Sequence, residues 1–168
     1  MRDRIVDFRR VPAGDLAVNS RNFRTHPEAQ REALRGLLKE VGIADALLAY
    51  HSERDGGRLT LIDGELRKTD NPDALWPVLI TDLNDAEADL MLSTLDPLSA
   101  MAGTDAGKLD ALLHDVTTDD AAVQEMLSKL AEESGIIPPD VEFKEFDESV
   151  ADEVKYHECP QCGHKFPA

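Results

Sequence analysis

The sequence predicts an α+β fold, in which a small mixed sheet with packed helices is followed by a helical extension and a short cysteine-bearing tail. Three observations indicate this fold. Within residues 1–102, short apolar runs bounded by turn residues alternate with segments of helical periodicity. From residue 103 to residue 135, only helical spacing is present. The chain then ends in a Cys-Pro-Gln-Cys-Gly motif.

Four strands are predicted at residues 5–11, 47–50, 59–62 and 77–80, where β-branched and other apolar residues cluster. The second and third strands flank Arg-Asp-Gly-Gly, a sequence typical of a hairpin turn. Trp76, just before the fourth strand, is expected to fill the core.

The first helix is expected to begin at Thr25, which would act as the N-cap and form a capping box with Glu28. Gly42 is expected to end this helix, because glycine readily adopts the left-handed conformation that follows a helix. A short helix should follow Gly64 and stop at Asn71-Pro72.

The second half of the chain reads as helices over residues 85–102, 106–115 and 119–133, and Asp96-Pro97 is expected to kink or break the first of them. After Pro138-Pro139 the chain alternates acidic residues with Val and Phe, which predicts a flexible linker. The predicted organisation is a first domain at 1–102, a helical extension at 103–135, an acidic linker at 136–156 and a knuckle at 157–168.

The net charge of −16 argues against a general nucleic-acid binder, because phosphate repulsion would dominate. The charge is unevenly distributed: residues 1–39 hold nine Lys and Arg against five Asp and Glu, whereas the remainder holds nine against twenty-nine. Two interpretations stay open. The N-terminal arginines face an anionic ligand, or they pair with the acidic remainder of the chain.

We expect a cytoplasmic protein, because no apolar run has the length needed to span a membrane and no leader precedes a cleavage site. Two cysteines are too few for a disulfide framework, and their C-x-x-C spacing in a reducing compartment suggests a metal. His26, His51 and His114 lack partners at catalytic spacing and are expected at the surface.

The junction after the third predicted strand carries the main candidate site. Gly64 permits a tight turn, and the following amides point outward as a helix begins. Glu65 is the candidate for catalysis or metal coordination, although it could instead cap the short helix. Arg67 is the candidate contact to a phosphate or a partner, and Asp63 is expected to support the turn or to assist metal binding.

A longer pattern surrounds this junction: Val11-Pro12, Leu16, Asn19 and Asn22-Phe23-Arg24 precede it, and Pro77–Ile80 and Asn84–Ala88 follow it. With Gly64-Glu65-Leu66-Arg67 as the Gly-Glu-Arg-Arg box, residues 6–102 resemble the N-terminal domain of the ParB and sulfiredoxin superfamily.

The resemblance implies a pocket in which Gly64, Arg67 and Arg24 bind the phosphates of a nucleoside triphosphate with magnesium, and in which Glu65 is catalytic. Two departures from the family pattern bear on this. Leu66 replaces the first Arg of the box, and residues 91–94 lack the Asn and Arg of partition-type members. Glu65 also stands where sulfiredoxins have a reactive Cys, which excludes sulfinic acid reduction.

Three functions are compatible with these features. The first is a ParB-like accessory protein in DNA transactions, of the short type that the resemblance associates with phages and mobile elements. DNA, a DNA methyltransferase or other phage protein, and a second copy of the chain are its expected partners. The second is a small phosphoryl-transfer enzyme of the same fold, either a kinase or a nuclease. The third is a protein-interaction module with a degenerate pocket.

The tail motif is typical of a zinc knuckle, in which Pro sets the turn and Gly permits a positive φ. Structural zinc normally takes four ligands, and Cys159 and Cys162 supply two. Three arrangements stay open: His157 and His164 complete the site, two chains share one zinc, or the knuckle holds no metal.

Overall fold

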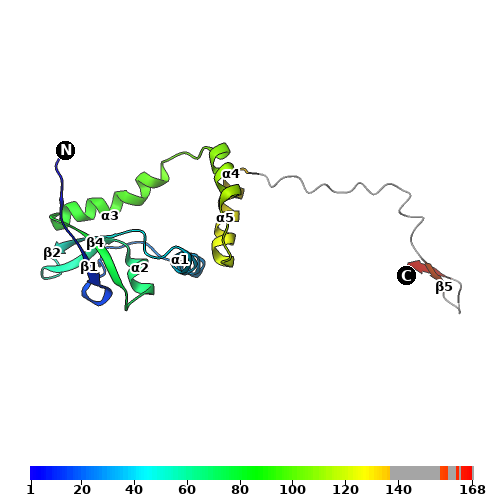
Figure 1. Ribbon diagram of the computed structural model, residues 1–168, viewed down its shortest axis with the longest axis horizontal. Coiled ribbons are helices and arrows are strands. Elements are labelled where there is room, and N and C mark those ends of the chain that lie inside the picture. The colour runs from blue at the N-terminus through cyan, green and yellow to red at the C-terminus, as the bar shows by residue number, and fades with distance from the viewer. Residues whose placement is uncertain (137–155, 159–161, 163, 168) are drawn as a thin grey trace. The chain divides into compact units, whose positions relative to one another are not determined.

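The computed structural model describes residues 1–136, 156–158, 162 and 164–167 (Figure 1). The chain divides into two compact units, Met1–Ile136 and Ile137–Ala168. The first unit contains the sheet and all the helices described below. The predicted acidic linker lies almost entirely outside the described residues.

A four-stranded mixed sheet forms the centre of the first unit, as predicted. Its strands are β1 (Ile5–Pro12), β2 (Leu47–Ser52), β3 (Arg58–Asp63) and β4 (Leu75–Thr81), in the spatial order β1-β4-β2-β3. β1 pairs with β4 and β2 pairs with β3 in antiparallel fashion, whereas β2 and β4 are parallel. The predicted hairpin between β2 and β3 is confirmed.

A short segment closes the outer edge of β3. After the 3-10 turn η1 (Ala13–Asp15), the backbone of Ala17 donates to the carbonyl of Leu59 at 2.8 Å and accepts from the amide of Leu61 at 2.9 Å. This contact holds the loop that follows, residues 18–24, next to the end of β3. The loop thereby reaches the candidate site.

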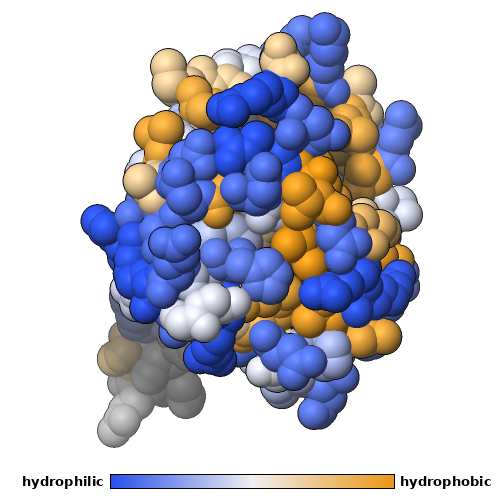
Figure 2. Space-filling model, turned by 90° about the vertical axis from the view of Figure 1, so that its left-hand side faces the viewer, coloured by the Kyte–Doolittle hydropathy of each residue, from blue (hydrophilic) through white to orange (hydrophobic). Residues whose placement is uncertain are grey.

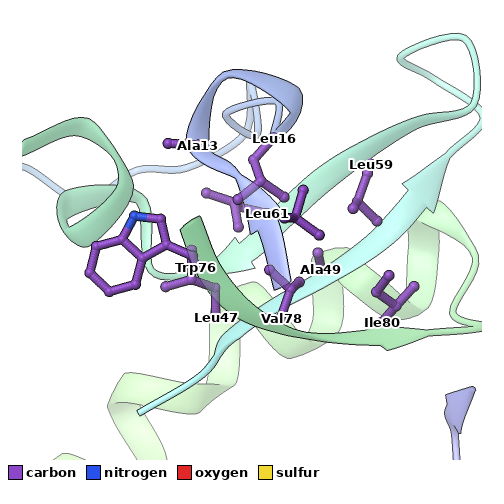
Figure 3. Packing of buried hydrophobic residues seen from close by; sticks show 10 residues of the cluster. Ala13, Leu16, Leu47, Ala49, Leu59, Leu61, Trp76, Val78 and Ile80 are labelled. Carbon is purple, nitrogen blue, oxygen red and sulfur yellow. The ribbon is translucent and has the colours of Figure 1, made fainter. Parts of the chain in front are cut away.

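Hydrophobic residues pack on both faces of the sheet, because successive side chains of a strand point to opposite sides. On one face, Trp76 is 1% exposed, which confirms its predicted place in the core (Figure 3). On the other face, Tyr50 and Ile62 pack with two residues of α3 (Asp85–Ala100). The first cluster comprises Val11, Ala13, Leu16, Leu47, Ala49, Leu59, Leu61, Trp76, Val78 and Ile80.

The remaining helices are α1 (Glu28–Glu40), α2 (Glu65–Asp70), α4 (Ala106–Asp115) and α5 (Ala121–Glu133). Figure 1 shows α1 between the sheet and α5. α1 contacts both α2 and α5, and α5 also contacts α4.

The start of α1 differs from the prediction. The helix begins at Glu28 with Pro27 in the N-cap position, and no side chain caps it, so the capping box of Thr25 and Glu28 is not formed. Pro27 has a φ of −65° and an extended ψ of 155°, and proline disfavours the helical conformation in the residue before it. The helix therefore starts after Pro27. Its predicted end is confirmed, since Gly42 has a φ of +83°.

A kink or a break was expected at Asp96-Pro97, and the break is wrong, because α3 runs through Pro97 to Ala100. Proline removes one backbone donor, which leaves a carbonyl in the preceding turn without its helical partner. The carbonyl concerned belongs to Ser93, which is exposed, and water can satisfy such a group. The start of α3 is strongly fixed by a capping box between Asn84 and Glu87.

Asp85, in the first turn of α3, joins this helix to the β2–β3 hairpin. Its carboxylate accepts from the Tyr50 hydroxyl at 2.9 Å, the Ser52 hydroxyl at 2.7 Å and the Arg54 backbone amide at 2.9 Å. The hydrogen bond from Ser52 is the main cause of the lowered pKa of Asp85. Burial raises the pKa of Tyr50. The buried Tyr50 hydroxyl thus has a hydrogen-bond acceptor in the Asp85 carboxylate, as a buried polar group requires.

The contact between α1 and α5 is unusually close at Gly36. A Cβ atom on Gly36 would come within 2.7 Å of both carboxyl oxygens of Asp120. Asp120 is the N-cap of α5, so Gly36 leaves the space that this cap occupies. Glu40 adds a second connection, since its carboxylate accepts from the Thr118 hydroxyl at 2.7 Å and from the Asp119 amide at 3.1 Å. α5 is thus fixed on α1 at its N-terminal end.

Most N-terminal arginines pair with acidic side chains, which favours the second interpretation of the charge distribution. Arg4 bonds both Asp82 and Glu87, and Arg21 bonds Asp89 at 2.9 Å. Arg9 lies 3.5 Å from Asp7. Arg24 belongs to the candidate site and is treated below.

The second unit contains a two-stranded antiparallel ribbon of β5 (Tyr156–Glu158) and β6 (Lys165–Pro167). Glu158 pairs with Lys165. Most residues of the cysteine motif between them lie outside the described part of the chain, so the predicted knuckle stays a prediction.

The surface face shown in Figure 2 is largely hydrophilic, in keeping with the charged composition, and is crossed by a band of hydrophobic residues. Within the described residues, none of the helices combines the length and the apolar character needed to cross a membrane.

We expect Glu87→Gln to flatten the acid end of the stability profile. The hydrogen bond from Arg4 is the main reason that the pKa of Glu87 falls from 4.5 to about 2. Because the folded pKa lies below the unfolded value, this stabilisation is complete above pH 4.5 and is lost as the pH falls toward 2. Urea unfolding between pH 6 and pH 2.5, at about half-unit steps, would measure it.

The control for this variant is Glu53→Gln, since Glu53 makes no ion pair within the described part of the chain. Equal pH dependence in the two variants would contradict the role of the Arg4–Glu87 pair.

We expect Gly36→Leu to lower the free energy of unfolding by about 1–3 kcal/mol, because the new side chain must displace the N-cap of α5. Gly107→Leu is the matched control, since the nearest atom to a Cβ there is 3.7 Å away. Denaturant unfolding measures the difference. Hydrogen exchange should show faster exchange in α5 only for Gly36→Leu, and equal protection of α5 in both variants would argue against this contact.

Candidate functional site

A cavity of about 560 Å³ opens where β3 passes into α2. Its walls come from the loop before α1, from α1 itself, from the β3–α2 junction and from single residues of α3 and α5. One end is charged and the other is apolar. The lining comprises Asn19, Asn22, Arg24, Thr25, His26, Gln30, Ala33, Leu34, Leu37, Leu61, Ile62, Asp63, Gly64, Glu65, Leu66, Arg67, Asp96 and Met126.

Gly64 makes the turn that shapes the charged end. Its φ is +101°, a conformation that residues with a side chain rarely adopt, and it is the N-cap of α2. A Cβ at this position would lie 2.3 Å from a methyl carbon of Leu47, which is fully buried. Both the backbone conformation and the available space therefore require glycine.

Glu65, the first residue of α2, points its carboxylate toward the loop before α1. The amide of Asn22 donates to this carboxylate at 2.5 Å. The backbone amide of Arg24 donates in turn to the side-chain oxygen Oδ1 of Asn22 at 3.2 Å. Asn22 therefore orients Glu65, and the predicted alternative of a helix cap is not observed, because no side chain caps α2.

Arg24 and Arg67, the two predicted phosphate ligands, are brought together by Asp63. One carboxyl oxygen of Asp63 lies 3.5 Å from Arg24, and the other accepts from Arg67 at 2.6 Å. The side chains of Arg24 and Arg67 are only 14% and 17% exposed. Asp63 therefore positions both arginines, a role that differs from the predicted support of the turn.

Each arginine also contacts a second carboxylate at the rim. Arg24 pairs with Asp96 of α3, and Arg67 pairs with Asp45 in the loop before β2. The side chains of Asp96 and Asp45 are 61% and 75% exposed, respectively. Ion pairs with such exposed partners contribute little to stability, so an incoming anion could replace either carboxylate at low cost.

The charge balance of the lining constrains any ligand. Three carboxylates line the cavity, from Asp63, Glu65 and Asp96, against two guanidinium groups. A polyphosphate would gain from a divalent cation that offsets this excess, because Mg²⁺ binds through one or two carboxylates together with substrate phosphates. Glu65 is the residue placed to hold such an ion, since Asp63 is already shared between the two arginines.

The apolar end of the cavity was not foreseen from the sequence. Leu34 and Leu37 of α1 line it together with Met126 of α5. His26, expected as a surface residue, lies at this end half-buried, and its ring nitrogen is 3.0 Å from the Gln30 side chain. The contribution of Met126 depends on the docking of α5 on α1, for which the sequence offers no local signal.

The described residues give the predicted zinc site only part of its ligand set. Cys162 and His164 are exposed and lie between β5 and β6, His157 lies in β5, and Cys159 falls outside the described residues. Among the described residues, no group of three His, Cys, Asp or Glu side chains is placed to hold a metal ion. Zinc at the knuckle therefore stays a prediction.

The sequence matches no known protein-family model and no curated protein. The structure is similar to the C-terminally truncated chromosome-partitioning protein ParB from Caulobacter crescentus complexed with CTP-gamma-S, with a TM-score of 0.54 and 19% identity over 74% of this chain and 79% of that chain. This chain has a ParB N-terminal-domain-like fold. The same truncated ParB complexed to the centromeric parS site gives a TM-score of 0.40 and 20% identity over 79% and 73% of the two chains.

The comparison confirms the fold that the sequence resemblance implied. In this ParB-like domain, the cavity is built around the predicted box residues, and Arg24, Gly64, Glu65 and Arg67 all line it. The identity of 19% leaves the roles of these residues to be argued from their own geometry.

We expect Gly64→Ala to lower the free energy of unfolding by about 2–4 kcal/mol, through left-handed strain and the clash with Leu47. Gly42→Ala is the matched control, because Gly42 also has a positive φ but has open space around it, so only the strain of about 1–2 kcal/mol applies. Urea unfolding of both variants measures the difference. Equal losses would mean that the packing against Leu47 imposes no constraint.

Proposed function

We propose that the cavity binds the phosphates of a nucleoside triphosphate with magnesium, and that the protein acts as a ParB-like accessory factor in DNA transactions. The observation that carries the proposal is the convergence of Arg24 and Arg67 on Asp63, beside the Gly64 turn, within a cavity of about 560 Å³. Two nearly buried guanidinium groups with mostly exposed rim partners are suited to phosphate oxygens.

The likeness to a partition protein complexed with CTP-gamma-S supports a nucleotide as the ligand. In the proposed mode, Arg24 and Arg67 exchange Asp96 and Asp45 for phosphate oxygens, while Asp63 continues to hold both side chains in place. Glu65, oriented by Asn22, would hold the magnesium ion that accompanies the phosphates.

The DNA role rests on the likeness to a chromosome-partitioning protein, and the net charge of −16 makes direct, general DNA binding unfavourable. We therefore propose that DNA is reached through a partner protein. A DNA methyltransferase or another phage protein is the kind of partner that the sequence resemblance implies.

Phosphoryl transfer is the second candidate function, and the hydrogen bond from Asn22 to Glu65 favours it. A carboxylate held beside two arginines is the arrangement that activates a nucleophile near a phosphoryl group. Release of phosphate from bound nucleotide, lost in Glu65→Gln while binding is kept, would support this activity. Binding without turnover would support the accessory role.

We expect Arg24→Ala and Arg67→Ala each to weaken nucleotide binding about 10- to 100-fold, as is typical when a hydrogen bond to a charged group is lost. Calorimetric titration with CTP, ATP and ADP in the presence of magnesium measures the affinities. The control is Arg58→Ala, since Arg58 is 60% exposed and lies outside the cavity.

Saturable binding that is weakened in both cavity variants and unchanged in the control would establish the phosphate site. The absence of binding by the wild-type protein, or equal effects in all three variants, would overturn the proposal and leave a protein-interaction role for the domain.

A further inference from the structure

The cavity continues into a second space that the proposed phosphate site does not use. A groove of about 460 Å³ runs between α1 and α5 and shares Gln30, Ala33 and Met126 with the main cavity. Ligand space therefore extends from the arginines, past these three residues, to the region between the two helices.

Where the two spaces meet, the wall is mainly apolar, whereas the groove beyond it is also lined by Glu32, Glu125, Lys129 and Glu133. α5 buries Val123, which is 6% exposed, yet it leaves Met126 47% exposed along the main cavity. Leu37 of α1 lines the same cavity and is 45% exposed. A single exposed apolar side chain is ordinary, but two that line one cavity next to a charged end form a surface able to bind an apolar group.

This wall is fixed in the absence of any ligand. The close approach of Gly36 to Asp120 and the hydrogen bonds that Glu40 accepts hold the N-terminal end of α5 on α1. Met126 lies in the helix that these contacts position, so its place along the cavity costs little further ordering when a ligand enters.

The two ends of the space call for a ligand with two chemically different parts. The arginines suit phosphate, whereas the leucines, the thioether of Met126 and the neutral amide of Gln30 suit a flat and mainly apolar ring with polar edges. A polarisable methionine side chain makes favourable contacts with aromatic rings. A nucleoside has this character, and free polyphosphate does not.

We propose that α5 forms the wall of a nucleoside subsite, in which Met126 contacts the base of the nucleotide whose phosphates lie at Arg24 and Arg67. This inference rests on the proposed function, because it assumes that phosphates occupy the charged end. It adds that the helical extension takes part in ligand binding, and that base preference depends on residues outside the predicted first domain.

The test compares Met126→Ala with the wild-type protein by calorimetry, using CTP, ATP and inorganic tripolyphosphate with magnesium as separate probes. We expect the variant to bind the nucleotide about tenfold more weakly and to bind tripolyphosphate within about twofold of the wild type, because only the nucleoside loses a contact. Met101→Ala is the matched control, since Met101 is 80% exposed and lines neither space.

The outcomes separate the two proposals. If the wild type binds neither nucleotide nor tripolyphosphate, both are overturned. If it binds tripolyphosphate as tightly as the nucleotides, the phosphate site stands and the nucleoside subsite is overturned. Equal weakening of both probes in Met126→Ala, or unchanged binding of both, also overturns the subsite. A selective loss of nucleotide affinity supports it.

Discussion

The carboxylate of Asp63 is the interaction on which the rest of the candidate site depends. It ends β3, and its two oxygens contact two arginines from different parts of the chain. Without it, the largely buried Arg24 and Arg67 would keep only their exposed partners at the rim, Asp96 and Asp45, and poorly compensated buried charges cost free energy. The site is therefore stable without a ligand because its cations already have an internal anion.

This arrangement also explains why the excess of acidic residues does not disqualify the cavity. Asp63 is structural, whereas Asp45 and Asp96 stand at the rim and are well hydrated. The carboxylates that pair with the two arginines therefore differ in how easily an anion can replace them. Their positions, more than their number, determine whether an anion can enter.

The elements that local chemistry specifies could be predicted from the sequence. The hairpin at residues 53–57, the left-handed Gly42 and Gly64, and the buried Trp76 each follow from one or two neighbouring residues. The predicted start of α1 was wrong, because Pro27 disfavours a helical conformation in the residue before it, and this outweighed the capping preference of Thr25. The predicted break in α3 was wrong, because water can satisfy the exposed carbonyl that loses its helical partner to Pro97.

The candidate site was predictable only in part, because only some of its residues are close together in the sequence. The proximity of Gly64, Glu65 and Arg67 could be predicted, since they lie within about one helical turn. Arg24 was found through the motif that precedes α1. By contrast, Asp45 and Met126 reach the site only through tertiary packing, which leaves no periodic or local signal in the sequence.

The strand order β1-β4-β2-β3 has a consequence for how the domain is made. Of these four strands β1 is synthesised first, yet its only described neighbour in the sheet is β4, which is synthesised last. Until α1, β2, β3 and α2 have followed it, β1 has no native strand to pair with. Closing this long loop slows folding, because chain entropy is lost before the ladder forms. During synthesis, Val6 and Phe8 belong to a strand without its native partner, and the nascent chain is then at its greatest risk of non-native association.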